Sequence, residues 1–426
     1  MSIEAIYQLF SASEGVCTDT RQIRPGVLFF ALRGTSYNGN LFAAAALEQG
    51  ASYAIIDDES CKVSDRCLLV QDVLSCLQEL ARFHRRRFTI PFIAVTGSNG
   101  KTTTKELIHS VLSTTYKTYA TKGNLNNHIG IPLTLLSIKE DAEMAIIEMG
   151  ANHQKEIEGY CRIAEPTHGI ITNIGKAHLE GFGGLEGVKK GKGELYAYLK
   201  SSGGTAFINS ANPLLMDIAR PEQAVFYPQE NDFYSCTLTE TNPYICFRAA
   251  NGDQVQTQLI GRYNFDNIAA ALCIARYFDV PDAAANRAIS AYVPDNNRSQ
   301  VIRQGTNTVL LDAYNANPSS MQAALENFAS LPGSGKVVIL GDMFELGEES
   351  EAEHERLGKM ICEKKFDTVL LCGTHMARAL KTCPEALYFT DRPALENYLS
   401  TVSFTGAQIL IKGSRGMGLE KLLPLL

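Results

Sequence analysis

Residues 95–105 read VTGSNGKTTTK, directly after the apolar run PFIA and directly before the helical pattern ELIHSVLSTT. A strand, a glycine-bearing turn and a helix start therefore follow one another, which is the layout of a phosphate-binding loop. In such a loop the glycines let backbone N–H groups approach a polyphosphate, and the helix N-terminus adds positive potential. Lys101 would reach the terminal phosphates, and the hydroxyl of Thr102 or Thr103 could ligate Mg²⁺.

The spacing inside this loop is shorter than usual. The common pattern G-x-x-x-x-G-K places more residues between its glycines, whereas only Ser98 and Asn99 separate Gly97 from Gly100 here. A chance glycine-rich turn is the alternative interpretation. The strand before the loop and the helix after it favour a site for a nucleoside triphosphate.

Composition indicates the general class of the protein. A chain of 426 residues is too long for one ordinary core, so two or three domains are expected. Its 45% hydrophobic and 20% charged residues are typical of a globular protein, and no apolar stretch approaches the roughly 18 residues of a membrane span. The first ten residues carry no basic region of a secretory signal, and the eleven cysteines form no C-x-x-C pair. We expect a cytoplasmic protein with buried thiols.

The net charge of −7 argues against binding to nucleic acid or to a membrane surface. The one basic cluster near an expected boundary is Arg85-Arg86-Arg87, which is interpreted as a solvated helix end. An acidic protein can still bind anionic substrates where local lysines, arginines and Mg²⁺ override the overall field.

Three segments differ in their pattern of apolar runs and helical stretches, and we expect domains at residues 1–88, 89–295 and 296–426. The first has short apolar runs and an alanine-rich helix. In the second, buried apolar runs such as MAIIEMG and GIITNIG alternate with helical stretches, which predicts a mostly parallel sheet flanked by helices. The third repeats this alternation with TVLLDAY, KVVILGDM, DTVLLCG and QILIKGS, each followed by a helical stretch. It predicts a second doubly wound unit with functional loops at the carboxyl ends of its strands.

Polar side chains follow several of these strands. Glu148 closes one of them, where acidic residues commonly hold Mg²⁺ on a nucleotide, although many such residues are merely solvated. His178 comes just beyond another strand, after Asn173, and a metal or nucleotide role is as plausible there as a structural one. Lys189, Lys190 and Lys192 resemble an exposed basic helix face. A crowded or buried lysine can nevertheless become neutral, and a neutral amine can react with carbon dioxide to form a carbamate.

Further polar clusters lie in the second half of the chain. Asn264 and Asn267 precede an alanine-rich helix, where they could cap the helix or hydrogen-bond to the edge of an adenine base. Asn317-Pro318-Ser319 is a good helix entry, but it does not explain why Asp312, Tyr314 and Asn315 crowd one strand end. The glycine-bearing loop around Lys412, Ser414 and Arg415 suits a carboxylate or phosphate ligand, with generic surface charge as the alternative.

Taken together, these segments resemble the Mur ligase family over nearly the whole chain. TGSNGKTTTK looks like the ATP loop of the family, and TKGNLNNHIGIPLTLL looks like the segment that follows it. EMGANH, NIGKAHLE, DAYNANPSSM, LGDMFELGEES and KGSRGMGLE match in order and spacing. The N-terminal Thr18-Asp19-Thr20-Arg21, LFFALRG and Asn38-Gly39-Asn40 resemble the uridine-nucleotide domain of these ligases.

The resemblance implies three domains: a small N-terminal α/β domain for the UDP-sugar, a central ATPase-like parallel sheet with flanking helices, and a C-terminal Rossmann-like domain. The sequence Asn-Ala-Asn-Pro is the variant of the dipeptide-adding member. The implied reaction is ATP-driven amide formation through an acyl phosphate, between UDP-N-acetylmuramoyl-tripeptide and D-alanyl-D-alanine. ATP and Mg²⁺ would be required, and a cytoplasmic monomer without nucleic-acid partners or membrane insertion is expected.

The resemblance also implies roles for individual residues. Lys101, Glu148, His178 and Lys192 would be catalytic, with Thr102 and Glu148 at a first metal ion and His178 and carbamylated Lys192 at a second. The nucleotide would be bound by Gly97, Ser98, Asn99, Gly100, Lys101, Thr102, Thr103, Asn267, Arg298 and Asp312. The substrates would be bound by Thr18, Asp19, Thr20, Arg21, Asn126, Asn127, Tyr314, Asn315, Asn317, Lys412, Ser414 and Arg415.

Three other interpretations remain at this point. A phosphate-loop kinase or switch-type NTPase would not need the N-terminal segment or the third unit. A folylpolyglutamate-type ligase would lack the N-terminal Asp-Thr-Arg domain. A non-catalytic nucleotide-binding protein would be expected to have lost Lys101, Glu148 or His178, and all three are present.

Overall fold

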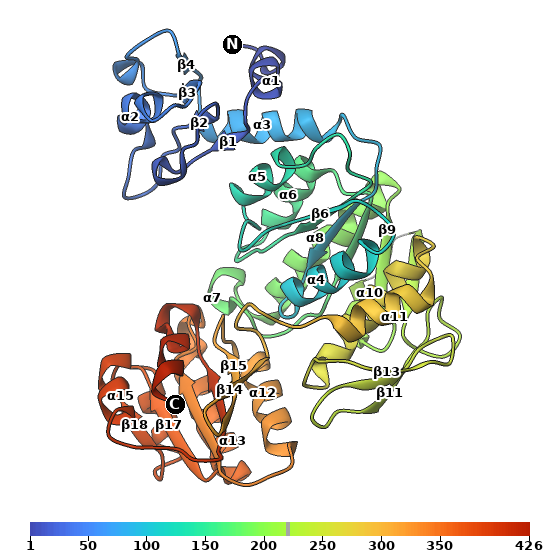
Figure 1. Ribbon diagram of the computed structural model, residues 1–426, viewed down its shortest axis with the longest axis vertical. Coiled ribbons are helices and arrows are strands. Elements are labelled where there is room, and N and C mark those ends of the chain that lie inside the picture. Colours follow the sequence, from blue (N-terminus) through green and yellow to red (C-terminus); the bar gives the residue numbers. More distant parts are fainter. Residues whose placement is uncertain (219–221) are drawn as a thin grey trace.

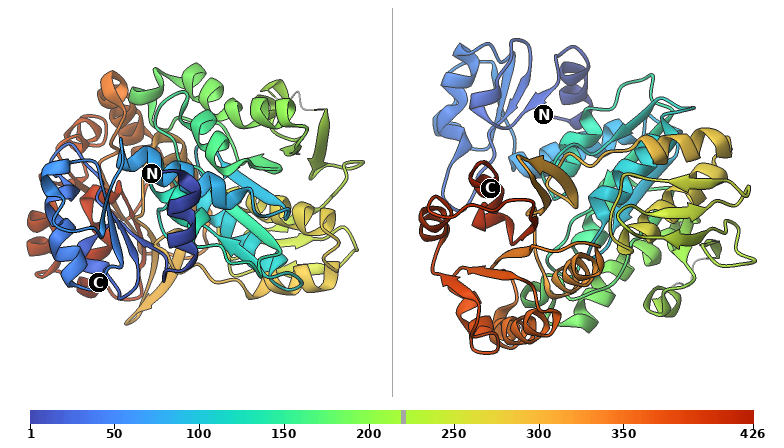
Figure 2. Two further views of the ribbon diagram at one scale, coloured as in Figure 1. Left: turned by 90° about the horizontal axis from the view of Figure 1, so that it is seen from above. Right: turned by 60° about the horizontal axis from the view of Figure 1, so that its bottom comes forward.

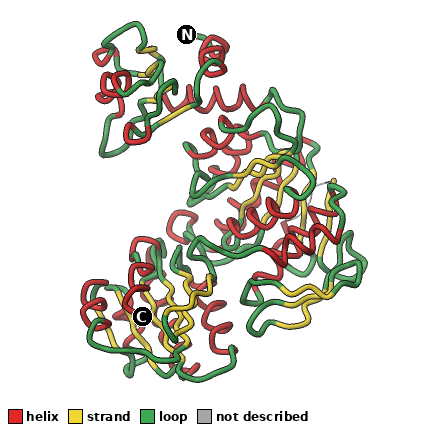
Figure 3. Tube along the Cα trace, in the orientation of Figure 1, coloured by secondary structure: helices red, strands yellow, loops and turns green. Residues whose placement is uncertain are grey.

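The computed structural model describes residues 1–218 and 222–426, which form three α/β regions in sequence order (Figure 1). The N-terminal region lies at one end of the molecule and the central region lies between it and the C-terminal region (Figure 1). All three regions contain both helices and strands (Figure 3). Among the described residues, no helix combines the length and the apolar character that a membrane span requires. The mixed α/β class expected from the sequence is confirmed.

The N-terminal region is a four-stranded parallel sheet in the order β1-β2-β3-β4. Its elements are α1 Ile3–Ser11, β1 Val16–Cys17, η1 Thr20–Gln22, β2 Leu28–Phe30, η2 Gly39–Phe42, α2 Ala43–Glu48, β3 Tyr53–Ile56, η3 Glu59–Cys61, β4 Cys67–Leu69 and α3 Val73–Arg85. Asp72 caps α3 by accepting from the backbone N of Ser75 (2.6 Å). Because α3 packs on α1 and also on α5 and α6, it joins this region to the central one.

The central region is built on a six-stranded parallel sheet in the order β10-β9-β8-β5-β7-β6. Its strands are β5 Phe92–Thr96, β6 Thr118–Ala120, β7 Met144–Glu148, β8 His168–Ile171, β9 Thr205–Asn209 and β10 Gln223–Tyr227. Its helices are α4 Lys101–Leu112, α5 Gly130–Leu136, α6 Glu156–Ala164, α7 Leu179–Phe182, α8 Leu185–Ser202, α9 Pro213–Ile218, α10 Tyr263–Tyr277 and α11 Asp282–Ala291. Every residue of β5, β7 and β9 is buried, as expected for strands covered by helices on both faces.

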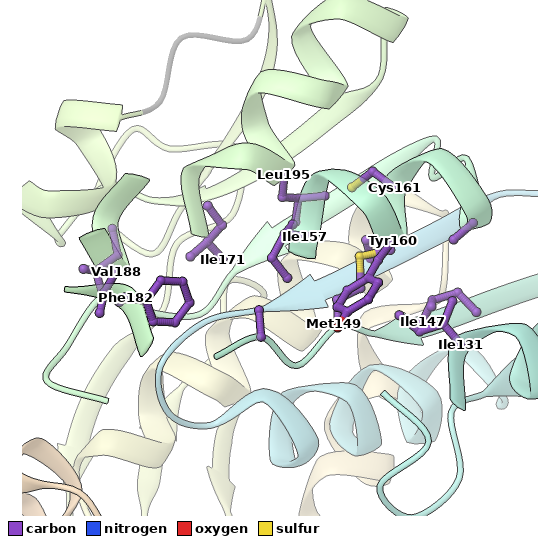
Figure 4. Close-up of a cluster of buried hydrophobic side chains, with 14 of the residues drawn as sticks. Ile131, Ile147, Met149, Ile157, Tyr160, Cys161, Ile171, Phe182, Val188 and Leu195 are labelled. Atoms are coloured by element: carbon purple, nitrogen blue, oxygen red, sulfur yellow. The ribbon is translucent and has the colours of Figure 1, made fainter. Parts of the chain in front are cut away.

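Two apolar layers cover this sheet. Residues of α5, α6 and α8 pack on one face, where Ile147, Ile157 and Leu195 meet in a cluster of buried side chains (Figure 4). Residues of α4, α10 and α11 pack on the other face, against Ile93 and Val95 of β5. The central strand β5 is therefore held from both sides, which fixes the position of the loop that follows it.

A small antiparallel sheet extends the central region. It consists of β11 Thr237–Glu240, β12 Cys246–Arg248 and β13 Gln254–Gln256, in that order. β13 contacts α11, and the sheet lies at the outer side of the molecule in two views (Figures 1 and 2). The sequence analysis did not anticipate this sheet, because its strands are short and mostly polar.

The C-terminal region contains a six-stranded sheet in the order β14-β15-β19-β16-β17-β18, in which only β14 runs antiparallel to its neighbour. Its elements are β14 Gln300–Gln304, β15 Asn307–Asp312, α12 Pro318–Ser330, β16 Lys336–Gly341, η4 Gly347–Glu349, α13 Ser350–Lys364, β17 Thr368–Cys372, α14 Met376–Leu380, β18 Leu387–Phe389, α15 Arg392–Leu399, β19 Gln408–Lys412, η5 Arg415–Met417 and η6 Leu419–Leu425. The helix expected after β19 is absent from the described residues. Only 3₁₀ segments follow β19, in a stretch that contains three glycines and Pro424.

The expectation of a fully solvated Arg85-Arg86-Arg87 cluster is wrong for Arg85. Its side chain is buried, donates from Nε to the carbonyl of Ala164 (2.9 Å) and lies over the ring of Phe92. Arg86 pairs instead with Glu165. Sequence reasoning missed this because the partners belong to elements far along the chain.

Candidate active site

The phosphate-loop pattern folds as a tight turn between β5 and α4. Gly97 has φ 143° and Gly100 has φ 77°, in the region that favours glycine. A Cβ atom on Gly97 would lie 2.0 Å from Oγ1 of Thr172, and one on Gly100 would lie 2.7 Å from Oδ1 of Asn267. Both glycines are thus required by backbone conformation and by close neighbours.

The loop is held in place by the chain that follows β8. Asn99 donates its backbone N–H to Oδ1 of Asn173 (3.0 Å), and its carbonyl accepts from Thr172 Oγ1 (2.6 Å) and from Asn173 Nδ2 (3.0 Å). Ser98 Oγ donates to the carbonyl of Gly175 (3.1 Å). These contacts fix the loop at the carboxyl end of the sheet, where ligands bind in open α/β sheets.

Lys101 begins α4 and turns back over the loop. Its Nζ donates to the carbonyls of Gly97 (2.8 Å) and Ser98 (3.2 Å). Burial lowers the pKa of Lys101 to about 8, since it disfavours the charged form, and Arg298 lowers it slightly further while Glu148 opposes both. An anionic phosphate placed here would favour the charged ammonium.

Glu148 lies at the end of β7 and is 1% exposed. Its Oε1 accepts from Thr102 Oγ1 (3.1 Å) and from Asn126 Nδ2 (2.9 Å). Its Oε2 is buried and has no hydrogen-bond partner within residues 1–218 and 222–426. A buried carboxylate oxygen without a donor, beside a threonine hydroxyl, fits a hard cation such as Mg²⁺.

Lys192 is the most unusual lysine of the described chain. It is 0% exposed, donates from Nζ to the carbonyl of Ala151 (3.0 Å) and lies over the ring of Phe182. Burial holds its pKa well below the usual value, and nearby Lys101 contributes to the same direction. No ion pair to Lys192 is found in the described residues. The exposed-helix interpretation is therefore wrong for this residue, and its environment favours the neutral amine.

His178 precedes α7 with a left-handed backbone (φ 52°). Its Nδ1 donates to the carboxylate of Glu345, which belongs to the C-terminal region. The contact brings a residue that follows β8 together with one that follows β16. Sequence reasoning did not single out Glu345, although it lies within the LGDMFELGEES segment.

Lys101, Glu148 and His178 line a cavity of about 640 Å³ between the central and C-terminal regions. It is lined by the predicted residues Ser98, Asn99, Gly100, Lys101, Thr103, Asn126, Asn127, Glu148, His178, Asn267, Arg298, Asp312, Tyr314, Asn315, Asn317 and Lys412. It is also lined by residues given no role from the sequence, among them Asn152, Glu156 and Tyr160. The predicted residues Gly97, Thr102, Lys192, Ser414 and Arg415 do not line it, and Ser414 instead accepts from the backbone N of Phe344 (2.9 Å).

Two predicted nucleotide residues, Asn267 and Arg298, lie far from the phosphate loop in the sequence but line the same cavity. Asn267 lies inside α10, so it is not a helix cap; it accepts from Thr104 Oγ1 (3.0 Å) and donates to Asn264 (2.9 Å). Arg298 stacks on the ring of Tyr314 at 3.6 Å, and its buried Nε has no partner among the described residues. A guanidinium that stacks on an aromatic ring and keeps an N–H group available is suited to binding a planar or phosphorylated ligand.

Asp312 and Lys412 end neighbouring strands of the C-terminal sheet. Lys412 Nζ donates to Asp312 Oδ2 (2.6 Å), while Asp312 Oδ1 accepts from the backbone N of Ser299 (3.1 Å). The crowding of polar residues after β15 is thus explained in part by this pair, which stiffens the strand ends. Arg415 is exposed and donates to the hydroxyl of Tyr314 (3.2 Å).

Asn317 makes a contact between the two regions at the cavity. Asn317 caps α12 through Oδ1, which accepts from the backbone N of Ser320 (2.9 Å), as the sequence predicts for a helix entry. Its Nδ2 donates to Oδ1 of Asn99 in the phosphate loop (2.8 Å). The same side chain therefore caps a helix of one region and contacts the loop of the other.

The N-terminal candidates Thr18, Asp19, Thr20 and Arg21 are not among the residues around this cavity. Asp19 caps η1 by accepting from the backbone N of Arg21 (3.0 Å), and the two side chains form an exposed ion pair. The structure thus leaves these residues in a separate region, and their predicted role in substrate binding stays a prediction.

Comparison with known proteins identifies the family. The chain is 34% identical over 421 residues to UDP-N-acetylmuramoyl-tripeptide–D-alanyl-D-alanine ligase of Bacillus subtilis, covering 96% of this chain and 92% of the relative. The chain belongs to the Mur ligase family. Models of that family match residues 13–85 (catalytic domain), 95–275 (middle domain) and 297–415 (glutamate ligase domain).

Other Mur ligases show the same likeness. The enzyme of that name from Escherichia coli is 34% identical, with coverage of 96% of this chain and 92% of the relative. The crystal structure of MurF from Acinetobacter baumannii matches with a TM-score of 0.87 and 30% identity over 98% of both chains. MurF ligase from Thermotoga maritima, solved in complex with ADP, matches with a TM-score of 0.85 and 27% identity over 97% of both chains.

Proposed function

We propose that the protein is an ATP-dependent ligase that joins D-alanyl-D-alanine to UDP-N-acetylmuramoyl-tripeptide, giving the UDP-pentapeptide used in peptidoglycan synthesis. The observation that carries the proposal is the near full-length similarity to enzymes named for this reaction. The cavity supports it, because a phosphate loop, an unpaired buried carboxylate oxygen and cationic side chains converge there from two regions.

The proposed reaction has two steps. The peptide carboxylate attacks the γ-phosphorus of ATP, which forms an acyl phosphate and releases ADP. The amine of D-alanyl-D-alanine then attacks the acyl carbon, and phosphate leaves through a tetrahedral intermediate as the amide forms. Water must be kept from the acyl phosphate between the steps, and closure of the C-terminal region over the cavity serves this purpose.

Approach of one polyanion to another is the physical obstacle. Two unit charges at ~4 Å repel by roughly 4 kcal/mol at an effective dielectric constant of about 20. Lys101, Arg298 and Lys412 line the cavity, and Lys412 comes from the C-terminal region. These three cations reduce the repulsion and orient the phosphates.

The residues present fit Mg²⁺. Glu148 and Thr102 would hold one ion, and His178 with carbamylated Lys192 would hold a second. Bound Mg²⁺ would supply charge neutralisation on the phosphates. Among the described residues, no group of three or more His, Cys, Asp and Glu side chains that could hold a metal ion is found.

Substrate contacts follow from the same arrangement. We infer that Gly97 to Thr103 surround the phosphates, with Asn267, Arg298 and Asp312 around the rest of the nucleotide. We assign the peptide to Asn126, Asn127, Tyr314, Asn315 and Asn317, with Lys412, Ser414 and Arg415 toward the dipeptide, and the uridine end to Thr18, Asp19, Thr20 and Arg21. A cytoplasmic monomer, acting on these two substrates without membrane insertion or nucleic acid, completes the proposal.

The test is phosphate release from ATP with UDP-N-acetylmuramoyl-tripeptide and D-alanyl-D-alanine, each omitted in turn. Release that requires both, together with the mass of a UDP-pentapeptide, is the expected result. Release that is indifferent to both would contradict the proposal and favour a phosphate-loop ATPase, and transfer of phosphate to a stable product would favour a kinase.

A further inference from the structure

The chain after β8 contacts the C-terminal region directly. The backbone N of Lys176 donates to Ser319 Oγ (3.0 Å), and Lys176 Nζ pairs with Glu353 of α13. Two residues further on, His178 pairs with Glu345. Two basic side chains of one loop thus meet two carboxylates of the other region.

Glu345 has a defined backbone position. Its φ is 62°, so both partners of the pair have left-handed backbones, which are strained for residues other than glycine. The carbonyl of Glu345 accepts from the backbone N of Glu180 at the start of α7 (3.3 Å). A Cβ on Gly347 would lie 3.2 Å from the side chain of Glu180, so the loop before η4 fits closely against α7. Strain of this kind persists only where the surroundings hold it.

The pair determines which ring nitrogen of His178 carries the proton. A carboxylate only accepts hydrogen bonds, so Nδ1 must be the donor, and the lone pair of the neutral ring lies on Nε2. His178 lines the large cavity, whereas Glu345 does not. Among the described residues no hydrogen bond to Nε2 is found. The hydrogen bond from His178 also holds the pKa of the Glu345 carboxyl below its usual value, although burial opposes this.

We propose that Glu345 is a positioning residue that the C-terminal region supplies on closure, and that it fixes His178 with Nδ1 protonated and Nε2 free toward the reaction cavity. The inference rests on the proposed ligase function and goes beyond it. A carboxylate behind a histidine orients the ring and raises its basicity as a ligand. Because the carboxylate comes from the other region, the free Nε2 is presented only when the cavity is closed. Phosphoryl chemistry is thereby coupled to the exclusion of water.

The neighbouring pair provides a matched control. Glu353 also contacts the loop after β8 from the C-terminal region, and its side chain is 6% exposed, but its partner is Lys176 rather than His178. Glu345→Met removes the acceptor at nearly constant side-chain length, Glu345→Gln restores an acceptor oxygen without charge, and Glu353→Met removes the other interregion pair. Melting temperatures establish that each variant folds.

The first readout is the tautomer of His178, measured by long-range ¹H–¹⁵N NMR on protein with ¹⁵N-labelled histidine, with His178→Asn to assign the signals. UDP-N-acetylmuramoyl-tripeptide and a non-hydrolysable ATP analogue are added to favour closure. We expect one Nδ1–H tautomer in the wild type and in Glu353→Met, but not in Glu345→Gln, because its side-chain amide can also donate to an unprotonated Nδ1. We expect a mixture of tautomers in Glu345→Met.

The second readout separates kcat from KM. Glu345→Met should lower kcat about ten- to hundredfold, the usual range for such outer partners, with KM for ATP and dipeptide within about threefold. Glu345→Gln should recover only part of kcat, because its amide can favour either tautomer, and Glu353→Met should lower kcat clearly less than Glu345→Met does. An unchanged tautomer and kcat in Glu345→Met, or equal effects in Glu345→Met and Glu353→Met, would overturn the inference. If the wild-type protein itself forms no amide, that result contradicts the proposed function and not the role of Glu345.

Discussion

At the scale of single residues, the state of Lys192 is the most informative test of the site. Its side chain is fully buried, and no carboxylate pairs with it within residues 1–218 and 222–426, so the neutral amine needed for a carbamate is favoured. Lys192→Ala should abolish amide formation, and high bicarbonate should not restore it. Phosphate release measures the effect, and Lys190→Ala, on the exposed side of the same helix, is the control. Wild-type turnover in Lys192→Ala would remove the carbamate from the mechanism.

Glu148 leads to a second prediction at this scale. Its Oε2 is buried and receives no hydrogen bond from any described residue, while Oε1 already accepts two. Glu148→Gln should raise the Mg²⁺ concentration for half-maximal activity at least about tenfold, since a neutral amide binds a hard cation weakly. The measurement is a Mg²⁺ titration of the initial rate, with the exposed Glu143→Gln as control. An unchanged titration would exclude Glu148 as a ligand.

At the scale of elements, the start of α12 combines a cap and an interregion contact in one side chain. Asn317→Ala should lower the free energy of unfolding by about 1 kcal/mol, the typical value of an N-cap. Asn317→Asp keeps the capping oxygen but cannot donate to Asn99. It should retain stability and raise the KM for ATP. Urea unfolding and steady-state kinetics separate the two effects, and equal destabilisation by both variants would contradict the assignment.

The start of β8 gives a prediction about pH. His168 lies against Phe207, Tyr277 and Phe278, and burial lowers its pKa to about 4. Because the folded-state pKa is below the unfolded value of about 6.5, stability is full above pH 6.5 and falls toward pH 4, by up to about 1.4 kcal/mol per pH unit. Urea unfolding at pH 7 and pH 4.5 should therefore show a smaller loss in His168→Gln than in the wild type. The exposed His153 is the control, and equal losses would contradict the prediction.

At the scale of the whole molecule, the pair Lys176–Glu353 measures the coupling of two regions. The Glu353 side chain is 6% exposed and Arg356 is a second, more distant partner at 3.4 Å. Lys176→Met should destabilise the protein, because it leaves a buried carboxylate with a weaker partner. The double variant Lys176→Met/Glu353→Met should recover much of that loss. A double-mutant cycle on melting temperature should give a coupling of about 0.5–3 kcal/mol, and a coupling near zero would mean that the pair does not hold the regions together.

Much of the fold could be predicted from the sequence because its signals are local. Buried apolar runs alternating with helical patterns gave the parallel sheets, and Asn317 was recognised as a helix entry. The sheet β11–β13 was missed since short polar strands carry no strong periodicity. Arg85 was assigned to solvent because its partner Ala164 lies far along the chain. The domain limits at residues 88 and 295 remain predictions.

The sequence alone determined the phosphate loop, the family and the residue types of the site. The reason is that glycine conformation, helix starts and strand ends depend on a few neighbouring residues. Tertiary structure decided which of those residues meet. Only packing could bury Lys192, leave one oxygen of Glu148 without a partner and bring Glu345 behind His178. The physical reason is that burial and long-range hydrogen bonds depend on segments far apart in the chain, whose distances no local pattern encodes.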